Sequence, residues 1–179
     1  IYIIVIYKGD IAMSKSVNLY VVVPCYNEEA VLHETSKQML ELFGEMKNDG
    51  LINDNSRIVF VDDGSKDKTW SIIDELTKAH TEISGIKLAK NAGHQNALFG
   101  GLMTVKDDCD CAISIDADLQ DDIHVIPDMV RNFIDGYDVV YGVRNKRDTD
   151  TFFKRTTAVG FYKLMQFMGV NIVFNHADY

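Results

Sequence analysis

The sequence predicts an α/β fold with a mainly parallel sheet flanked by helices on both faces. Short apolar runs alternate along the chain with longer segments that have the 3.6-residue period of amphipathic helices. The apolar runs lack regular polar alternation, which is typical of parallel strands covered on both sides. Polar or turn residues follow these runs, as expected where parallel strands end at a ligand-binding edge.

The first half of the chain contains two strand–helix pairs. A Val-rich run predicts a strand at 18–24, and the spacing of the following apolar residues predicts a helix at 28–43. A second apolar run predicts a strand at 57–61, followed by a helix at 68–80. The candidate core positions of these helices are Ala30, Val31, Met39, Leu40, Leu42, Phe43, Ile72, Ile73 and Leu76.

The second half continues this order. A short strand is expected at 84–88, and the helix expected at 95–105 contains Gly and Ala residues that would let it pack close to the sheet. An apolar strand at 111–115 precedes a helix at 123–134, and a last strand is expected at 137–141. Because parallel strands end at the same edge, we expect the residues that follow them to form one site.

The motif after residue 115 reads Asp116-Ala117-Asp118-Leu119-Gln120. Alternate side chains of an extended segment point to the same face, so Asp116, Asp118 and Gln120 can share a side. Their oxygens are suitable ligands for Mg²⁺ or Mn²⁺, which also bridge to substrate phosphates. The motif therefore predicts a cation site for a phosphorylated substrate, although it could also be an acidic turn that only solvates a strand end.

Two other strand ends carry groups suited to a ligand. One reads Asp62-Asp63-Gly64-Ser65, where a carboxylate could accept from a base N–H or a ribose hydroxyl. Shortly after it, Asp67 could cap the next helix. The other reads Asn91-Ala92-Gly93-His94, where Gly93 would allow close approach of the backbone. His94 could contact a phosphate or simply lie on the surface.

Composition limits the class of protein. A chain of 179 residues suits one domain with a substantial core, and a net charge of −9 argues against general nucleic-acid binding. Between Arg144 and Lys163, six basic residues against two acidic ones give a local charge of +4, which could hold an anion. The odd cysteine count, Cys25, Cys109 and Cys111, favours a reducing, cytosolic location without a zinc site.

The two ends of the chain carry weaker signals. No apolar run approaches the roughly 20 residues needed to span a bilayer. Met13 resembles a natural start, so residues 1–12 are expected to be an extension outside the fold and residues 13–179 a domain truncated at its C-terminal end. After residue 150, aromatic and basic residues interleave, which fits a helix on a membrane surface or a terminal helix packed on the core.

Other phosphate-binding classes fit this sequence less well. Neither G-x-G-x-x-G nor G-x-x-x-x-G-K-[ST] occurs, which argues against a dinucleotide-binding domain and a P-loop. A phosphatase nucleophile at Asp116 and Asp118, or a receiver domain that uses Asp62 and Asp63, would leave the other strand ends unexplained.

Several ordered motifs resemble those of family 2 glycosyltransferases, from Val17 to the end of the chain. They include Val21-Val22-Val23-Pro24-Cys25-Tyr26-Asn27-Glu28-Glu29 and Val61-Asp62-Asp63-Gly64-Ser65-Lys66-Asp67-Lys68-Thr69. The acidic motif at 116–120 is similar to the Asp-x-Asp motif of dolichol-phosphate mannose synthases and bacterial polyprenyl-phosphate glycosyltransferases. The bacterial branch is resembled most at Phe153-Lys154-Arg155-Thr156-Thr157-Ala158.

The resemblance implies a GT-A, Rossmann-like fold and inverting, metal-dependent transfer of a sugar from a nucleotide-sugar donor to a polyprenyl phosphate. The implied donor-binding residues are Pro24, Tyr26, Asn27, Glu28, Asp62, Asp63, Asn91, Gly93, His94, Asp116 and Ala117. The implied ligands of Mg²⁺ or Mn²⁺ are Asp116, Asp118 and Gln120. Arg144 and Arg155 would hold the acceptor phosphate, and Asp118, Arg144 and Asp178 are the implied catalytic residues.

The resemblance also suggests partners and a location. UDP-glucose is the expected donor, and the full-length protein is expected at the cytoplasmic face of the bacterial membrane, with this fragment soluble. Nucleic acid is not an expected partner, and assembly into a homo-oligomer stays open. Two alternatives remain at this point: a saccharide acceptor, for which Asp178 would act as a base, and a module that binds nucleotide sugars without turnover.

Overall fold

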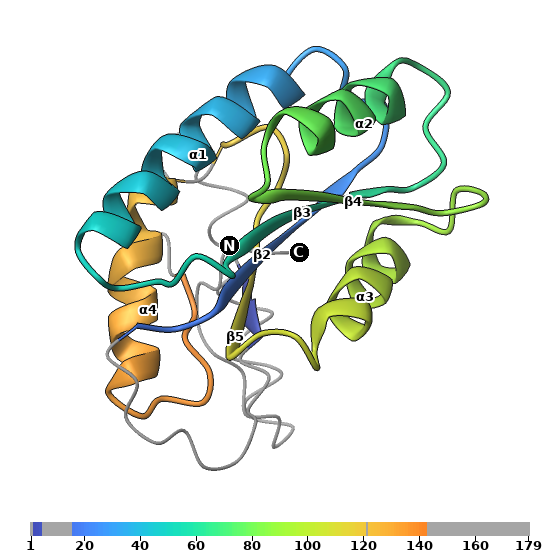
Figure 1. The fold of residues 1–179 in the computed structure, drawn as a ribbon. Coiled ribbons are helices and arrows are strands. Elements are labelled where there is room, and N and C mark those ends of the chain that lie inside the picture. The colour runs from blue at the N-terminus through green and yellow to red at the C-terminus, as the bar shows by residue number, and fades with distance from the viewer. Residues whose placement is uncertain (1, 5–15, 121, 143–179) are drawn as a thin grey trace, which may run out of the picture. The chain divides into compact units, whose positions relative to one another are not determined.

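The computed structural model describes residues 2–4, 16–120 and 122–142. Within these residues, a five-stranded sheet has the order β1-β5-β2-β3-β4 (Figure 1). Its strands are β1 (Tyr2–Ile4), β2 (Leu19–Cys25), β3 (Arg57–Asp62), β4 (Ile83–Lys87) and β5 (Cys111–Ser114). β1 pairs antiparallel with β5 and the other pairings are parallel, which confirms the mainly parallel sheet.

Helices cover both faces of the sheet, as predicted (Figure 1). They are α1 (Leu32–Asn48), α2 (Thr69–Ala79), α3 (His94–Val105) and α4 (Ile126–Ile134), the last preceded by a 3₁₀ turn, η1 (Ile123–Val125). The core on one face joins α1, α2 and α4 to side chains such as Val21, Phe60 and Ile113. The core on the other face joins α3 to Val22 and Val61. Alternate residues of β2 thus serve opposite cores, which explains why this strand is apolar throughout.

Helix α1 differs from the prediction at both ends. It begins at Leu32 instead of residue 28, because residues 28–31 form a turn in which the Val31 and Leu32 N–H groups both bond to the Glu28 carbonyl. It continues to Asn48, and Met46 is a further buried position. Ala30 is therefore exposed, and the early core positions predicted for this helix were wrong.

The strand expected at 137–141 is not formed. Residues 137–140 belong to no strand, and Tyr137 and Val139 are 60% and 47% exposed. A strand needs a backbone partner, and the sheet edge beside β5 is occupied by Tyr2–Ile4. These three residues also differ from the expectation that residues 1–12 lie outside the fold; the rest of that segment lies outside the described residues.

The parallel register brings several chain segments to one edge of the sheet. Cys25 at the end of β2 pairs with Asp62 at the end of β3, and Asp62 pairs with Lys87 at the end of β4. On the other side of β2, Val22 pairs with Ser114, the last residue of β5. The segments that follow these four strands therefore leave the sheet next to one another, which is the arrangement that the sequence predicted.

The contact between α3 and the sheet depends on Gly101. A Cβ there would lie 2.7 Å from Val61 Cγ2 and 2.8 Å from Val22 Cγ1, whereas a Cβ at Gly100 would meet nothing within 4 Å. We expect Gly101→Ala to destabilise the protein by about 1–2 kcal/mol net, because overpacking outweighs the better helix propensity of Ala. Gly100→Ala should instead stabilise it by about 1 kcal/mol. Urea unfolding of both variants tests this; equal effects would contradict the close packing.

Candidate active site

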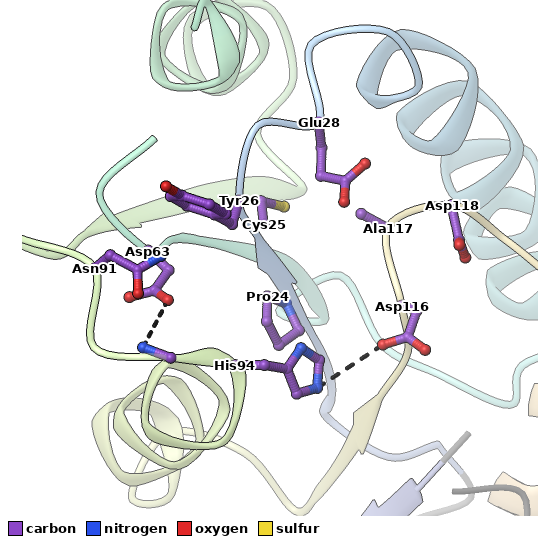
Figure 2. A pocket seen from close by; sticks show the side chains of 11 residues that line it. Pro24, Cys25, Tyr26, Glu28, Asp63, Asn91, His94, Asp116, Ala117 and Asp118 are labelled. Carbon is purple, nitrogen blue, oxygen red and sulfur yellow. Dashed lines mark hydrogen bonds and ion pairs between the residues drawn. The ribbon is translucent and has the colours of Figure 1, made fainter. Parts of the chain in front are cut away.

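A pocket of about 240 Å³ lies at the carboxyl edge of the sheet (Figure 2). Its lining residues are Pro24, Cys25, Tyr26, Glu28, Asp63, Asn91, Gly93, His94, Asp116, Ala117 and Asp118. All of these except Cys25 were singled out from the sequence. Tyr26, Asp63 and Asn91 lie on one side of the pocket, and Asp116 and Asp118 lie on the other (Figure 2).

The acidic side of the pocket is the segment that follows β5. Asp116 and Asp118 are exposed, whereas Ala117 between them is buried. Both aspartates line the pocket, and the buried Ala117 between them anchors the segment. Asp118 Oδ1 accepts a hydrogen bond from the Gln120 N–H at 3.2 Å, and Leu119 has a positive φ of 51°. Gln120 itself does not line the pocket, so the structure brings together two of the three predicted metal ligands.

Two carboxylates are suited to a cation that the substrate helps to hold. Across residues 2–4, 16–120 and 122–142, no group of three or more His, Cys, Asp or Glu side chains could hold a metal ion. Mg²⁺ usually binds through one or two carboxylates together with substrate phosphates and water, and so does not need a complete protein cage. The residues present therefore fit a cation shared with a diphosphate.

His94 lies at the start of α3 and faces the acidic segment. Its Nε2 is 3.9 Å from Asp116 Oδ1, and both side chains are about half exposed (Figure 2). The glycine before it, Gly93, has a φ of 89°. This backbone conformation favours glycine and lets the chain turn from the pocket wall into the helix.

Asp63 holds the opposite wall of the pocket. It is only 2% exposed, and its two carboxylate oxygens accept hydrogen bonds from the Ala92 N–H at 2.6 Å and the Gly93 N–H at 2.9 Å. Gly64 makes this contact possible, because a Cβ there would lie 2.6 Å from the Asn91 nitrogen. Asp63 therefore sets the path of the segment that leads to His94.

Asp62 and Asn27 do not line the pocket, although both were expected to bind the donor. Asp62 is fully buried below it; its Oδ1 accepts from the Ser65 N–H at 3.1 Å, and its Oδ2 has no hydrogen-bond partner among the described residues. Asn27 has a φ of 58°, and its Oδ1 accepts from the Lys66 N–H at 2.9 Å. Both side chains serve the turn at 64–66.

A network of hydrogen bonds joins the segments that follow β2 and β3. The Asn27 N–H donates to Ser65 Oγ at 3.0 Å, and the Glu28 N–H donates to Thr69 Oγ1 at 2.8 Å. These bonds hold the backbone at Asn27 and Glu28. Tyr26 and Glu28, which line the pocket, are thereby kept in place. Sequence reasoning did not find Ser65 or Thr69, since the contacts join residues about 40 positions apart and no local pattern reports them.

Asp67 completes this network and supports the start of α2. Its Oδ1 accepts from the Thr69 N–H at 3.0 Å and its Oδ2 from the Glu29 N–H at 3.2 Å. Burial acts to raise the pKa of Asp67, but the hydrogen bonds from Thr69 and Glu29 outweigh it and lower the pKa below its usual value. The predicted role of Asp67 at the helix start is confirmed.

The carboxylate of Glu28 lies in a position that disfavours its ionised form. Burial raises the pKa of Glu28 above its usual value, and the negative charges of Asp118 and other nearby carboxylates raise it further. A carboxyl whose pKa is raised by folding contributes stability that is complete below the unfolded pKa, about 4.3, and is lost as the pH rises through the folded pKa. The ionised Glu28 therefore lowers the stability of the folded protein at neutral pH.

We expect Glu28→Gln to raise the Tm of the ligand-free protein at pH 7.5, because the variant carries no charge at this position. The difference should shrink as the pH falls toward about 4.3, the usual pKa of a glutamate, because the raised pKa of Glu28 lets the wild type take up its proton before that point. Thermal unfolding at both pH values measures it, with Glu41→Gln on the exposed face of α1 as control. A variant that melts below the wild type at pH 7.5 would contradict the assignment.

The predicted acceptor residues Arg144 and Arg155, and the predicted catalytic residue Asp178, lie outside the described residues. Within the part of the chain that the structure describes, none of the helices has the length and apolar character needed to cross a bilayer.

Fold and site together define an α/β domain with an acidic, ligand-sized pocket at the carboxyl edge of a parallel sheet, the usual binding edge of such domains. A family model for glycosyl transferase family 2 matches residues 20–179. The chain belongs to this family, as the motifs indicated.

Individual relatives agree with the family assignment. The chain is 53% identical over 161 residues to the uncharacterized glycosyltransferase YkoT of Bacillus subtilis, a match that covers 90% of this chain and 48% of YkoT. It is 41% identical over 143 residues to the prophage bactoprenol glucosyl transferase homolog of Escherichia coli K12, covering 80% of this chain and 44% of that protein. The chain thus spans about half the length of the relatives it matches.

A solved structure supports the fold. TarS of S. aureus superposes with a TM-score of 0.51 at 20% sequence identity, over 75% of this chain and 38% of the TarS chain. At this identity the likeness concerns the fold alone. Together with the family match, it confirms the expected GT-A fold class.

Proposed function

We propose that this domain is the catalytic part of an inverting, metal-dependent glycosyltransferase that moves a sugar from a nucleotide sugar to a polyprenyl phosphate. The observation that carries the proposal is the pocket itself. Two carboxylates of one segment, Asp116 and Asp118, face a wall built by Tyr26, Asp63 and Asn91. The family membership and the relatives named bactoprenol glucosyl transferase support the reaction and the acceptor.

The two sides of the pocket have different tasks in this proposal. Tyr26 offers an aromatic face at the mouth, where it is 40% exposed, and suits a nucleobase. Asn91 supplies polar groups beside it, while Asp63 holds the backbone of that wall in place. The diphosphate of the donor then lies toward Asp116 and Asp118.

Asp116 and Asp118 would hold Mg²⁺ or Mn²⁺ against the donor diphosphate. When bound, the cation supplies positive charge that stabilises the departing nucleoside diphosphate. The buried Ala117 anchors the segment that carries the two carboxylates, and His94 Nε2 lies 3.9 Å from Asp116 Oδ1. Burial is the main cause of the raised pKa of Glu28, and the nearby charges of Asp118 and Asp116 add to it, which is consistent with an acidic pocket that a cation would help to neutralise.

The residues proposed to bind the acceptor lie outside the residues that the structure describes. A polyprenyl phosphate is already an anion and needs little help from a base. The planar guanidinium groups of Arg144 and Arg155 suit its phosphate oxygens. Attack from the face opposite the leaving group inverts the sugar configuration, and Asp178 orients the reacting groups. We propose UDP-glucose as donor and the cytoplasmic face of the bacterial membrane as the site of action.

A panel of nucleotide sugars tests the donor assignment. Thermal unfolding is recorded with each donor, with and without Mn²⁺, since a ligand that binds only the native state raises the Tm. UDP-glucose together with Mn²⁺ should raise the Tm by more than the sum of the shifts that UDP-glucose alone and Mn²⁺ alone cause. A Tm that no donor raises, with or without Mn²⁺, would refute the proposed function.

A transfer assay with polyprenyl phosphate and saccharide acceptors side by side then decides the acceptor. Transfer to the lipid phosphate is the predicted result. Transfer to the saccharide alone would mean an enzyme of polymer synthesis. Donor binding without transfer by a longer protein would mean a binding module.

A further inference from the structure

A buried hydroxyl of helix α1 contacts the segment at 116–120. Thr35 is 1% exposed, and its Oγ1 donates a hydrogen bond to the carbonyl oxygen of Ala117 at 2.5 Å, across 82 positions of sequence. The same Oγ1 is 3.0 Å from the Val31 carbonyl of its own helix. A hydroxyl has one proton, and the shorter distance assigns it chiefly to Ala117.

The position of the accepting carbonyl makes this bond important for the pocket. The Ala117 carbonyl belongs to the peptide unit that leads directly into Asp118, and Ala117 follows Asp116. A rotation of this peptide unit would therefore move the two carboxylates relative to each other. The Gln120 N–H bond to Asp118 lies within the segment and cannot hold it to the rest of the protein. The Thr35 bond ties the segment to a helix that is packed in the core.

We propose that Thr35 is a positioning residue that fixes the spacing of Asp116 and Asp118, and thereby sets the affinity of the pocket for a divalent cation with a nucleoside diphosphate. The inference rests on the proposed function, because it concerns the same cation. Thr35 does not line the pocket and acts only through the Ala117 carbonyl. Loss of the hydroxyl leaves this buried carbonyl without its partner, so the peptide would turn to find another.

The chain offers a close control in the neighbouring residue. Ser36 is also buried, at 2% exposed, but its Oγ bonds to the His33 carbonyl of the same helix at 3.0 Å. Ser36→Ala therefore removes a buried hydroxyl from α1 without touching the segment at 116–120. Thr35→Val keeps the shape of the side chain and removes its hydroxyl, whereas Thr35→Ser keeps the hydroxyl.

The test compares these three variants with the wild type in a Mn²⁺ titration followed by electron paramagnetic resonance, with UDP present. Thr35→Val should raise the Kd for Mn²⁺ about tenfold, which corresponds to the loss of one buried hydrogen bond. Thr35→Ser and Ser36→Ala should stay within about twofold of the wild type. A Thr35→Val variant with wild-type Mn²⁺ affinity, or an equal loss in Ser36→Ala, would overturn the proposal.

Hydrogen–deuterium exchange without any cation tests the positioning role of Thr35 independently of the proposed function. Amides at 116–120 should exchange about tenfold faster in Thr35→Val than in the wild type or Ser36→Ala. Unchanged exchange would contradict the positioning role. A wild type that fails to bind Mn²⁺ with UDP would instead contradict the proposed function. If Thr35→Val does not fold, Thr35→Ala takes its place in both measurements.

Discussion

Asp118→Ala should reduce sugar transfer on the order of a thousandfold, since it removes an electrostatic contact at the charge that develops on the leaving group. Asp118 lines the pocket together with Asp116. Only one of the two carboxylates would remain, so the cation would be held more weakly with the donor. The variant should therefore also lose the part of UDP affinity that depends on Mn²⁺.

The matched control for this prediction is Asp122→Asn. Asp122 belongs to the same acidic stretch, but its Oδ1 caps η1 by accepting from the His124 N–H at 2.9 Å, and it does not line the pocket. Asparagine keeps that acceptor and removes the charge, so transfer should stay within about twofold of the wild type. Isothermal titration calorimetry with UDP, with and without Mn²⁺, measures the part of the UDP affinity that depends on Mn²⁺. Unchanged transfer in Asp118→Ala would refute the metal assignment.

Asp63→Ala is expected to have the largest effect on stability, a loss of about 2–4 kcal/mol in the free energy of unfolding. The carboxylate is buried and accepts two backbone N–H groups, those of Ala92 and Gly93. Hydrogen bonds to a charged acceptor contribute more than neutral ones, and the two buried donors would be left without a partner. The segment that carries Asn91 and His94 would then lose its fixed path, and donor affinity should fall as well.

Urea unfolding measures this loss, and Asp74→Asn is a suitable control. Asp74 pairs with Lys78 on the surface of α2, where both side chains are about half exposed or more. Exposed ion pairs contribute little, so the control should change the free energy of unfolding by less than about 0.5 kcal/mol. If Asp63→Ala loses no more than this control, Asp63 does not hold the wall of the pocket.

The fold could be predicted largely from the sequence because strands of a sheet that is covered on both faces are continuous apolar runs. β2 contributes Val22 to one core and Val21 and Val23 to the other, so every position is apolar. Parallel strands also end at one edge, which let the polar residues after them be assembled into a site before any geometry was known. Most of the predicted donor-binding residues line the pocket for this reason.

Details that depend on distant partners were not visible in the sequence. The turn at 28–31 that delays the start of α1 begins at Glu28, whose N–H is held by Thr69, 41 positions away. Asp62 and Asn27 also shape a turn through bonds to Ser65 and Lys66, which the motif does not reveal. Thr35 reads as an ordinary helix residue, and its contact with Ala117 spans 82 positions. No local pattern reports such contacts, because each depends on how the elements pack.

The most direct test of the account is a crystal structure of this protein grown with UDP and Mn²⁺. Anomalous scattering from manganese locates the ion independently of the protein atoms. We expect the anomalous manganese peak between the carboxylates of Asp116 and Asp118 and the diphosphate of UDP, with the uracil beside Tyr26. Manganese bound elsewhere, or a diphosphate that avoids these two carboxylates, would contradict it.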